Sequence, residues 1–295
     1  MIFTFGEFTA LFSAFLWGNS GVLLKSLPAK TRLSFIFLES LISGSVILSL
    51  LFIFNEWSDF NDFTPYTIIG GVLASIINLC GSICYIFTIK HVKVGMAFVV
   101  INSLFPLFSI IGSIIFLKES LSLTIYLGAL LILAGIAIIT LQKGKKISFL
   151  EEGSSFKIAL IFCVITPLCW ATGALFMDRL LETQGVLPMT LIRAATTFTI
   201  CLALTIFIKK VDFLGIFGST EKRKKLIFAS FLTTGAMLGW FTSLSLSEAS
   251  LTIILGSSAP IFAVIGARVF LKEKFDRKGI FGIITCGLGV LVVIV

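Results

Sequence analysis

The chain has 295 residues, of which 57% are hydrophobic and only 13% are charged, and its mean hydropathy is +1.10. Soluble globular domains carry about a quarter of charged residues, so this composition excludes that class and indicates a polytopic membrane protein. The formal charge of +8 does not indicate a nucleic-acid partner, because the basic residues lie in short loops between apolar runs.

Apolar runs of about 20 residues, the length that crosses the hydrocarbon core as a helix, alternate with short polar loops along the whole chain. The first run has no basic segment before it and no cleavage site, so we expect it to be retained as a helix. We predict an all-α membrane protein with ten transmembrane helices, near residues 7–25, 33–54, 66–89, 95–117, 121–142, 157–177, 187–208, 226–246, 250–271 and 278–295.

The fourth predicted helix is repeated in the ninth. Asn102–Glu119 aligns with Gly256–Glu273, with Pro106 opposite Pro260 and Phe-Leu-Lys-Glu at both ends, at an offset of 154 residues. We therefore predict a first five-helix repeat over residues 1–142, a basic linker loop over 143–156 and a second five-helix repeat over 157–295. Because five is an odd number, the second repeat enters the bilayer upside down, which makes an inverted repeat.

Other residues extend the repeat beyond this helix. The offset of 154 recurs between the glycines of the fifth and tenth helices and between aromatic residues of the third and eighth, and the first and sixth helices follow at 153. The pairs are Gly128 with Gly282, Gly135 with Gly289, Phe87 with Phe241, and Trp17 with Trp170.

Two charged residues, Glu39 and Arg193, lie inside predicted helices at equivalent positions of the two repeats. A charge inside a membrane span is costly unless it is paired or hydrated. In a functional interpretation, Glu39 binds a proton or the cationic part of a substrate, and Arg193 binds an anion or a carboxylate. In a structural interpretation, each side chain reaches the headgroups or pairs with a neighbour.

We expect further polar and aromatic side chains to line a central cavity, where aromatic walls with a few amide donors suit an organic solute of modest size. Interhelical hydrogen bonds and interfacial positions are the structural alternative. Pro106 and Pro260 each remove a backbone donor at membrane depth and are hinge candidates, with a structural kink as the alternative. The substrate-binding candidates are Asn19, Glu39, Asn78, Tyr85, Asn102, Trp170, Thr172, Arg193, Trp240 and Ser257.

No metal site, cofactor site or enzyme active site is predicted. His91 is the only histidine and lies in a basic turn, and the six cysteines fall inside apolar runs as small buried thiols. Neither a glycine-rich phosphate loop nor a nucleophile with an acid–base partner is found, which disfavours an ATP-driven pump and an intramembrane enzyme. Energy is expected from a gradient or from exchange.

The basic residues predict the orientation. Lys and Arg gather in the segments that follow the first, third, fifth, seventh and ninth helices, whereas the opposite segments hold Lys118 and Arg179 beside several acidic residues. By the positive-inside rule, the basic loops face the cytoplasm and both termini lie outside.

Together these residues resemble the drug/metabolite transporter superfamily, specifically its ten-helix EamA-like branch, over the whole chain. The resemblance is carried by the repeated proline helix with its Phe-Leu-Lys-Glu end, by the paired glycines and by the two tryptophans named above. It implies a basket in which helices one to four and six to nine enclose a central cavity, with helices five and ten outside. Relatives usually carry arginine in both the second and the seventh helix, whereas this chain has Glu39 in the second, and they more often have both termini inside.

We predict a secondary transporter, not an enzyme, that moves a small organic metabolite across the cell (inner) membrane by alternating access. An amino acid, a nucleotide-like cofactor and a drug-like solute are the expected substrates, with a gradient or exchange as the driving force. The expected partners are this solute, a proton or counter-substrate, and the lipid bilayer, in a monomer or a homodimer. The alternatives are a flippase for a lipid-linked head group, with a cavity open sideways to the bilayer, and a non-transporting scaffold or sensor with a solidly packed centre.

Overall fold

The computed structural model describes residues 4–25, 27, 31–91, 94–118, 121–140, 156–207, 220–270 and 277–294. Over these residues the regular structure is helical throughout, without a strand. This agrees with the prediction of an all-α protein, and it follows from the apolar surroundings, because a helix satisfies its backbone hydrogen bonds within one segment. The predicted basic linker 143–156 lies almost wholly outside the described residues.

The first repeat forms helices close to the predicted ones. Its elements are α1 (Phe5–Lys25), α2 (Thr31–Phe54), the short helix η1 (Glu56–Asp62), α3 (Pro65–His91), α4 (Val94–Gly112), the π-helical turn η2 (Ser113–Leu117) and α5 (Leu123–Thr140). The second repeat consists of α6 (Phe156–Leu181), α7 (Val186–Phe207), α8 (Thr220–Leu246), α9 (Ala249–Gly256), α10 (Ala259–Phe270) and α11 (Arg277–Ile294).

The predicted single helix over 250–271 is wrong, because the structure divides it into α9 and α10 at a turn of Ser257 and Ser258. Pro260 is the second residue of α10, a first-turn position where a proline leaves no helical hydrogen bond unmade. In the turn before it, the Ser257 backbone N and Oγ both donate to Ile253 O, at 2.9 Å and 2.8 Å, and the Ser258 backbone N and Oγ both donate to Leu255 O, at 3.1 Å and 2.6 Å. In the first repeat, Leu104 stands where Ser258 would align, and α4 continues through Pro106.

Five described helical stretches are long and apolar enough to cross a membrane by length and composition. They are Ser34–Phe54, Pro65–Tyr85, Leu160–Leu181, Val186–Phe207 and Thr220–Leu246. Shorter apolar stretches occur at Leu104–Leu117, Leu123–Gly135, Ala249–Ala263 and Ile280–Gly289. The structure therefore has the character of a multi-pass membrane protein, and the number of ten spans stays a prediction.

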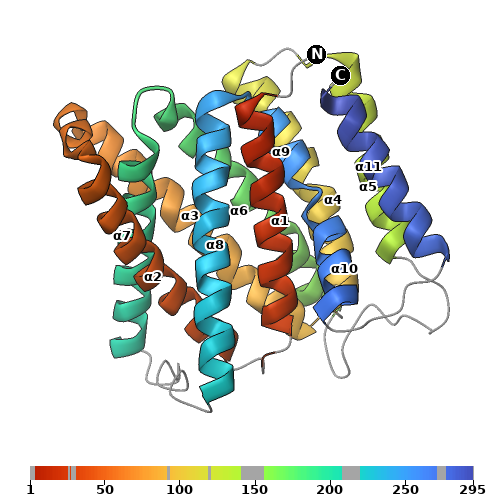
Figure 1. The fold of residues 1–295 in the computed structure, drawn as a ribbon, viewed down its shortest axis with the longest axis horizontal. Helices are drawn as coiled ribbons and strands as arrows, with labels where there is room; N and C mark the ends of the chain where they lie inside the picture. The colour runs from red at the N-terminus through yellow and green to blue at the C-terminus, as the bar shows by residue number, and fades with distance from the viewer. Residues whose placement is uncertain are drawn as a thin grey trace.

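Equivalent helices of the two repeats run in opposite directions (Figure 1). The packing follows the same symmetry, since α1 packs on α8 and its counterpart α6 packs on α3, while α2 packs on its own counterpart α7 and α5 on its counterpart α11. In Figure 1 the α5–α11 pair stands at one side of the other helices. The symmetry of the repeat therefore relates the α1–α8 pair to the α6–α3 pair, and it relates the two helices within α2–α7 and within α5–α11 to each other.

Side-chain packing fixes the register of the exchanged pairs. Gly173 of α6 lies against Ala74 of α3, whose carbonyl oxygen is 3.2 Å from the Cβ position of the glycine. In the other half, Ser20 of α1 lies in the same way against Ala229 of α8, with 3.4 Å between Ser20 Oγ and the Ala229 carbonyl oxygen. These contacts give an offset of 153 for α1 and α6 and of 155 for α3 and α8.

The predicted pairing of Phe87 with Phe241 does not agree with this packing. Phe87 is 40% exposed and stacks on Phe162, whereas Phe241 is 3% exposed and lies in a core cluster with α6 and α9. The offset of 155 instead aligns Tyr85 with Trp240.

The glycines of α5 and α11 let these two helices approach closely. A Cβ atom at Gly289 would lie 2.8 Å from the Gly128 carbonyl oxygen and 2.7 Å from the Ile132 backbone nitrogen, so only glycine fits there. Gly287, two residues earlier, has no heavy atom within 4 Å of its Cβ position. Close helix contact at small residues is the usual mode of packing in membranes.

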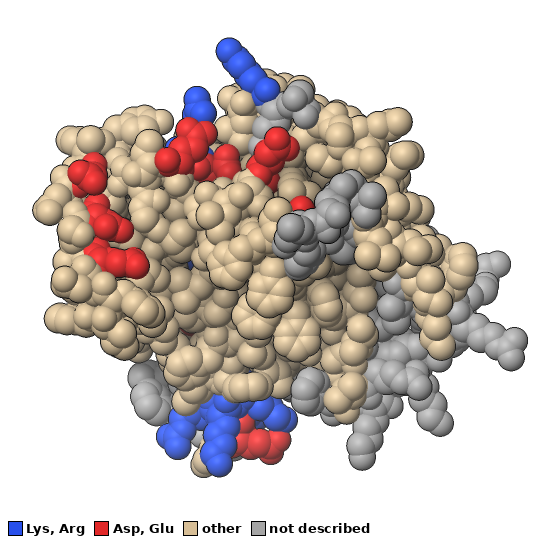
Figure 2. Space-filling view, turned by 45° about the horizontal axis from the view of Figure 1, so that its top comes forward, with Lys and Arg blue, Asp and Glu red and all other residues tan. Residues whose placement is uncertain are grey.

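The two termini lie at the same end of the molecule (Figure 1). Figure 2 shows carboxylates gathered toward this end and a group of basic side chains at the opposite end. The described basic residues of that group begin α8, at Lys222, Arg223, Lys224 and Lys225, whereas η1 carries Glu56, Asp59 and Asp62. The molecule therefore has an acidic and a basic end.

Candidate functional site

An ion pair joins α2 to α7. Arg193 Nη2 lies 2.6 Å from Glu39 Oε1, and the residues are only 7% and 4% exposed. The sequence left a binding role and pairing with a neighbour open for both side chains, and the structure shows each as the partner of the other. A charge-assisted hydrogen bond of this length is strong, and it compensates part of the cost of burying both charges.

The ion pair lies well inside both helices. Glu39 comes eight residues after the first residue of α2, and Arg193 comes seven residues after the first residue of α7. At 1.5 Å per residue these are depths of about 10–12 Å. Because α2 and α7 begin at opposite ends of the molecule (Figure 1), the two side chains meet between the ends rather than at a rim.

The partners of this ion pair are equivalent residues of the two repeats, since their separation of 154 positions is the repeat offset. Two equivalent groups can touch each other only where the pseudo-twofold axis passes between them. The Glu39–Arg193 contact therefore marks the position of the axis between α2 and α7.

Ser43 of α2 and Thr197 of α7 are a second pair of equivalent polar residues, each one helical turn after the charged residue of its own helix. Both are buried and share the offset of 154. Among the described side chains, Ser43 Oγ and Arg193 Nε are two of the buried polar atoms without a hydrogen-bond partner. Sequence reasoning did not select Ser43 and Thr197, although the constant offset was a signal that could have identified them.

Three aromatic side chains meet near the middle of α1 and α6 and in the last third of α3. The rings of Trp17 and Trp170 are 6.5 Å apart in an edge-to-face arrangement, and Tyr85 lies 5.5 Å from Trp170. Trp170 Nε1 donates to Ser82 Oγ at 3.3 Å. Trp17 and Trp170 are equivalent at the offset of 153, so this contact also lies near the axis, and Trp17 is still 40% exposed.

Trp240 has different neighbours from its counterpart Tyr85. Its ring lies 6.2 Å from Phe105 of α4 and against Gly256 at the end of α9, where no Cβ would fit. Tyr85 instead packs on Trp170. The aromatic groups are therefore symmetric at the axis and asymmetric away from it.

The remaining predicted residues differ in their surroundings. Asn19 is buried, and its Nδ2 donates to Phe15 O at 2.8 Å within α1. Asn78 is half-buried beside Gly173, and Thr172 is also half-buried. Ser257 is buried in the turn between α9 and α10 and donates within the chain. Asn102 lies in α4 and Pro260 in α10, but their side chains are outside the described part of the structure.

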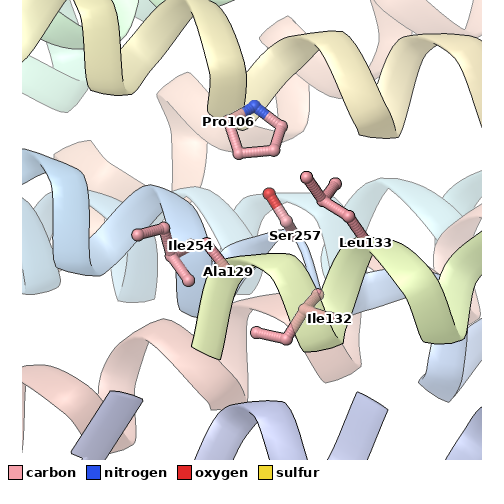
Figure 3. Close-up of a pocket in the computed structure, with 6 residues that line it drawn as sticks. All are labelled: Pro106, Ala129, Ile132, Leu133, Ile254 and Ser257. Atoms are coloured by element: carbon pink, nitrogen blue, oxygen red, sulfur yellow. The ribbon is translucent and has the colours of Figure 1, made fainter. Parts of the chain in front are cut away.

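The two hinge candidates occupy different helical positions. Pro106 is buried inside α4, whereas Pro260 is the second residue of α10. Pro106 faces an apolar recess toward α5, α9 and the turn after it (Figure 3), lined by Pro106, Ala129, Ile132, Leu133, Ile254 and Ser257. The recess is too narrow to admit a water molecule, so it is a packing contact of Pro106 and no solute site.

Within the described residues, no group of three or more His, Cys, Asp or Glu side chains is arranged to hold a metal ion. The described cysteines Cys80, Cys84, Cys163, Cys169 and Cys201 are free thiols. The described interior therefore offers the Glu39–Arg193 ion pair, the buried carboxylates of Glu7 and Asp178, hydroxyl and amide groups, and aromatic faces.

Comparison with known proteins gives a consistent result. The model of the EamA-like transporter family matches residues 4–141 and again 157–295. A protein of Archaeoglobus fulgidus, described as an uncharacterized transporter, is 28% identical over 218 residues, which cover 72% of this chain and 71% of the relative. A solved crystal structure has a TM-score of 0.77 at 14% identity, covering 97% of this chain and 95% of its own, and this likeness concerns the fold alone.

Proposed function

The chain belongs to the EamA-like transporter family, and from this premise we propose that it is a secondary carrier of a small organic metabolite that works by alternating access. It is a membrane transporter and not an enzyme. In the proposed arrangement, ten spans form two inverted halves in the cell membrane, with α9 and α10 together serving as one span.

The observation that carries the mechanism is the Glu39–Arg193 contact between equivalent residues of the two repeats. It supports a pseudo-twofold axis in the membrane plane, which relates helices that run in opposite directions (Figure 1). In such an arrangement the two halves can exchange conformations, and a site near the axis then opens to one side or to the other.

We place the solute beside Trp17, Trp170 and Tyr85, with Asn78 as an amide group two helical turns before Tyr85 on α3. Trp17 is 40% exposed although its ring meets Trp170 at the axis. Aromatic faces with a few polar groups suit a ring-bearing or partly apolar organic solute. Because Glu39 and Arg193 neutralise each other, neither charge is free to bind a charged solute. The ion pair therefore supports a solute without net charge, such as a zwitterionic amino acid or a neutral cofactor.

The driving force is a gradient or exchange against a second solute, since the sequence contains no phosphate-binding glycine loop. The basic end of the molecule, with Lys222–Lys225 at the start of α8, is proposed to face the cytoplasm. Both termini, at the opposite end (Figure 1), then lie outside.

Uptake into proteoliposomes tests the proposal. The purified chain is reconstituted and offered a panel of radiolabelled amino acids, nucleosides and nicotinamide, with protein-free liposomes as the blank. We expect at least one solute to accumulate, and Trp170→Ala to reduce its uptake at least tenfold. Trp57→Ala is the matched control, because Trp57 packs on Phe52 and Phe60 at the acidic end. No accumulation of any solute, or equal uptake by the two variants, contradicts the proposal.

A further inference from the structure

The Glu39–Arg193 contact has a special position in an alternating carrier, and this inference rests on the proposed function. When two inverted halves exchange conformations, residue i takes over the surroundings of its equivalent and the reverse. A contact between residues of different equivalent pairs then becomes another contact. A contact between two equivalent residues, such as Glu39 with Arg193 at the offset of 154, becomes itself.

We propose that the Glu39–Arg193 ion pair is a permanent pivot, closed in both the inward-facing and the outward-facing state, and that the other helices move around it. Glu39 and Arg193 are then positioning residues that hold α2 and α7 together, and neither charge is released to a proton or to the solute during the cycle. This assignment differs from a coupling site, in which the ion pair must open once in each cycle.

The geometry of the ion pair suits a pivot. Arg193 reaches Glu39 through Nη2, and its Nε has no hydrogen-bond partner among the described residues. A two-pronged arginine–carboxylate contact would fix the relative orientation of the two groups, whereas one short contact holds a distance and permits rotation. Beside it, the Cβ position of Gly44 lies 3.8 Å from Ala194 Cβ, and Phe37 of α2 stacks on Phe198 of α7 with ring centroids 5.1 Å apart, so the two helices also meet through residues that are not equivalent.

Contacts away from the axis have the opposite property. Phe105 of α4 packs on Trp240 of α8 at 6.2 Å, and the equivalent contact would join Ala259 of α10 to Tyr85 of α3. Tyr85 packs on Trp170. Because Phe105 and Trp240 are not equivalent residues, an exchange of the halves would turn their contact into a different one.

Distances between spin labels test the pivot without knowledge of the solute. The six native cysteines are replaced, and nitroxide labels are attached at exposed positions of the chain in lipid nanodiscs. Leu41→Cys with Ala195→Cys reports on α2 and α7 within two residues of the ion pair. Leu107→Cys with Leu246→Cys reports on α4 and α8, and both of these positions are exposed to about half of their surface.

We expect one narrow distance distribution for the α2–α7 labels and two populations for the α4–α8 labels. In Glu39→Gln, the α2–α7 distribution is expected to broaden. Two populations for the α2–α7 labels in the unmodified pair would overturn the pivot while leaving alternating access intact. One population for both label pairs would contradict alternating access itself, and the pivot with it.

Discussion

The α2–α7 pair and the pair formed by α4 and α9–α10 each consist of equivalent helices of the two repeats. They differ in how far the sequence and the structure share the symmetry. At α2–α7, different residues, Glu39 and Arg193, occupy equivalent positions and produce one shared contact. At the repeated proline helix, sequences that share nine of 18 aligned residues have different backbones: α4 runs through Pro106, whereas the second copy turns at Ser257 and Ser258 before Pro260. Symmetry of sequence and symmetry of structure are thus separate properties.

The physical reason lies in what each region contacts. Residues on the pseudo-twofold axis face their own equivalents, so complementarity between the two repeats stabilises the contact directly. Residues away from the axis face different helices in the two halves, and aligned positions there also carry different side chains, as Ser258 and Leu104 do. We therefore expect substitutions at the axis to have the largest effects.

The largest effect is expected for Glu39→Gln, which leaves the Arg193 charge buried and unpaired. Removing one partner of a buried ion pair costs about 3–5 kcal/mol. The matched control is Glu182→Gln, which opens the Arg179–Glu182 ion pair, whose side chains are 58% and 52% exposed, and exposed pairs contribute about 1 kcal/mol or less. Thermal unfolding in detergent measures the stability of both variants. Equal losses would contradict the claim that the buried Glu39–Arg193 pair contributes more to stability than the exposed Arg179–Glu182 pair.

The glycine contact between α5 and α11 gives the next effect. Gly289→Ala places a methyl group 2.8 Å from the Gly128 carbonyl oxygen, and such overpacking costs about 1–3 kcal/mol. Gly287→Ala adds the same methyl group on the same helix, where no atom lies within 4 Å, and should be neutral or slightly stabilising. Midpoints of thermal unfolding for the two variants separate packing from helix propensity.

The prolines test the asymmetry away from the axis. Pro106→Ala restores a backbone donor inside α4, where it can bond the carbonyl four residues earlier, and a gain of about 1 kcal/mol is expected. Pro260→Ala restores a donor at the second residue of α10, where no helical acceptor exists, so stability should change little. Equal shifts in the unfolding midpoint of the two variants would contradict the prediction that only Pro106 removes a helical hydrogen bond.

The smallest effect concerns the equivalent interfaces α1–α8 and α6–α3. Ser20 Oγ and Thr233 Oγ1 are 2.7 Å apart, whereas Thr88 Oγ1 and Thr166 Oγ1 are 3.4 Å apart. Double-mutant cycles should give a coupling of about 0.6 kcal/mol for the first pair, a typical value for such bonds in membranes, and less for the second. A larger coupling for Thr88 with Thr166 would contradict the assignment of the stronger hydrogen bond to Ser20 and Thr233.

The sequence was sufficient to predict the helical class, most helices to within a few residues and the offset of 154. Apolar length and periodic repetition are local signals, and they require no knowledge of neighbours. The Glu39–Arg193 contact was not predicted, because an offset shows that two residues are equivalent and does not show that they touch. The division of α9 from α10 was missed for a similar reason, since a shared proline motif shows that two segments are equivalent and does not show that the backbone of one turns at Ser257 and Ser258.

Exchange of the two charges tests the central claim most directly. In Glu39→Arg with Arg193→Glu, each repeat receives the residue of the other, and a contact on the axis should form again with its direction reversed. We predict that the double variant recovers most of the thermal stability lost by either single substitution, and that it accumulates the solute found in the uptake panel. A double variant as unstable as the single ones would contradict the placement of this ion pair on an axis that relates the two halves.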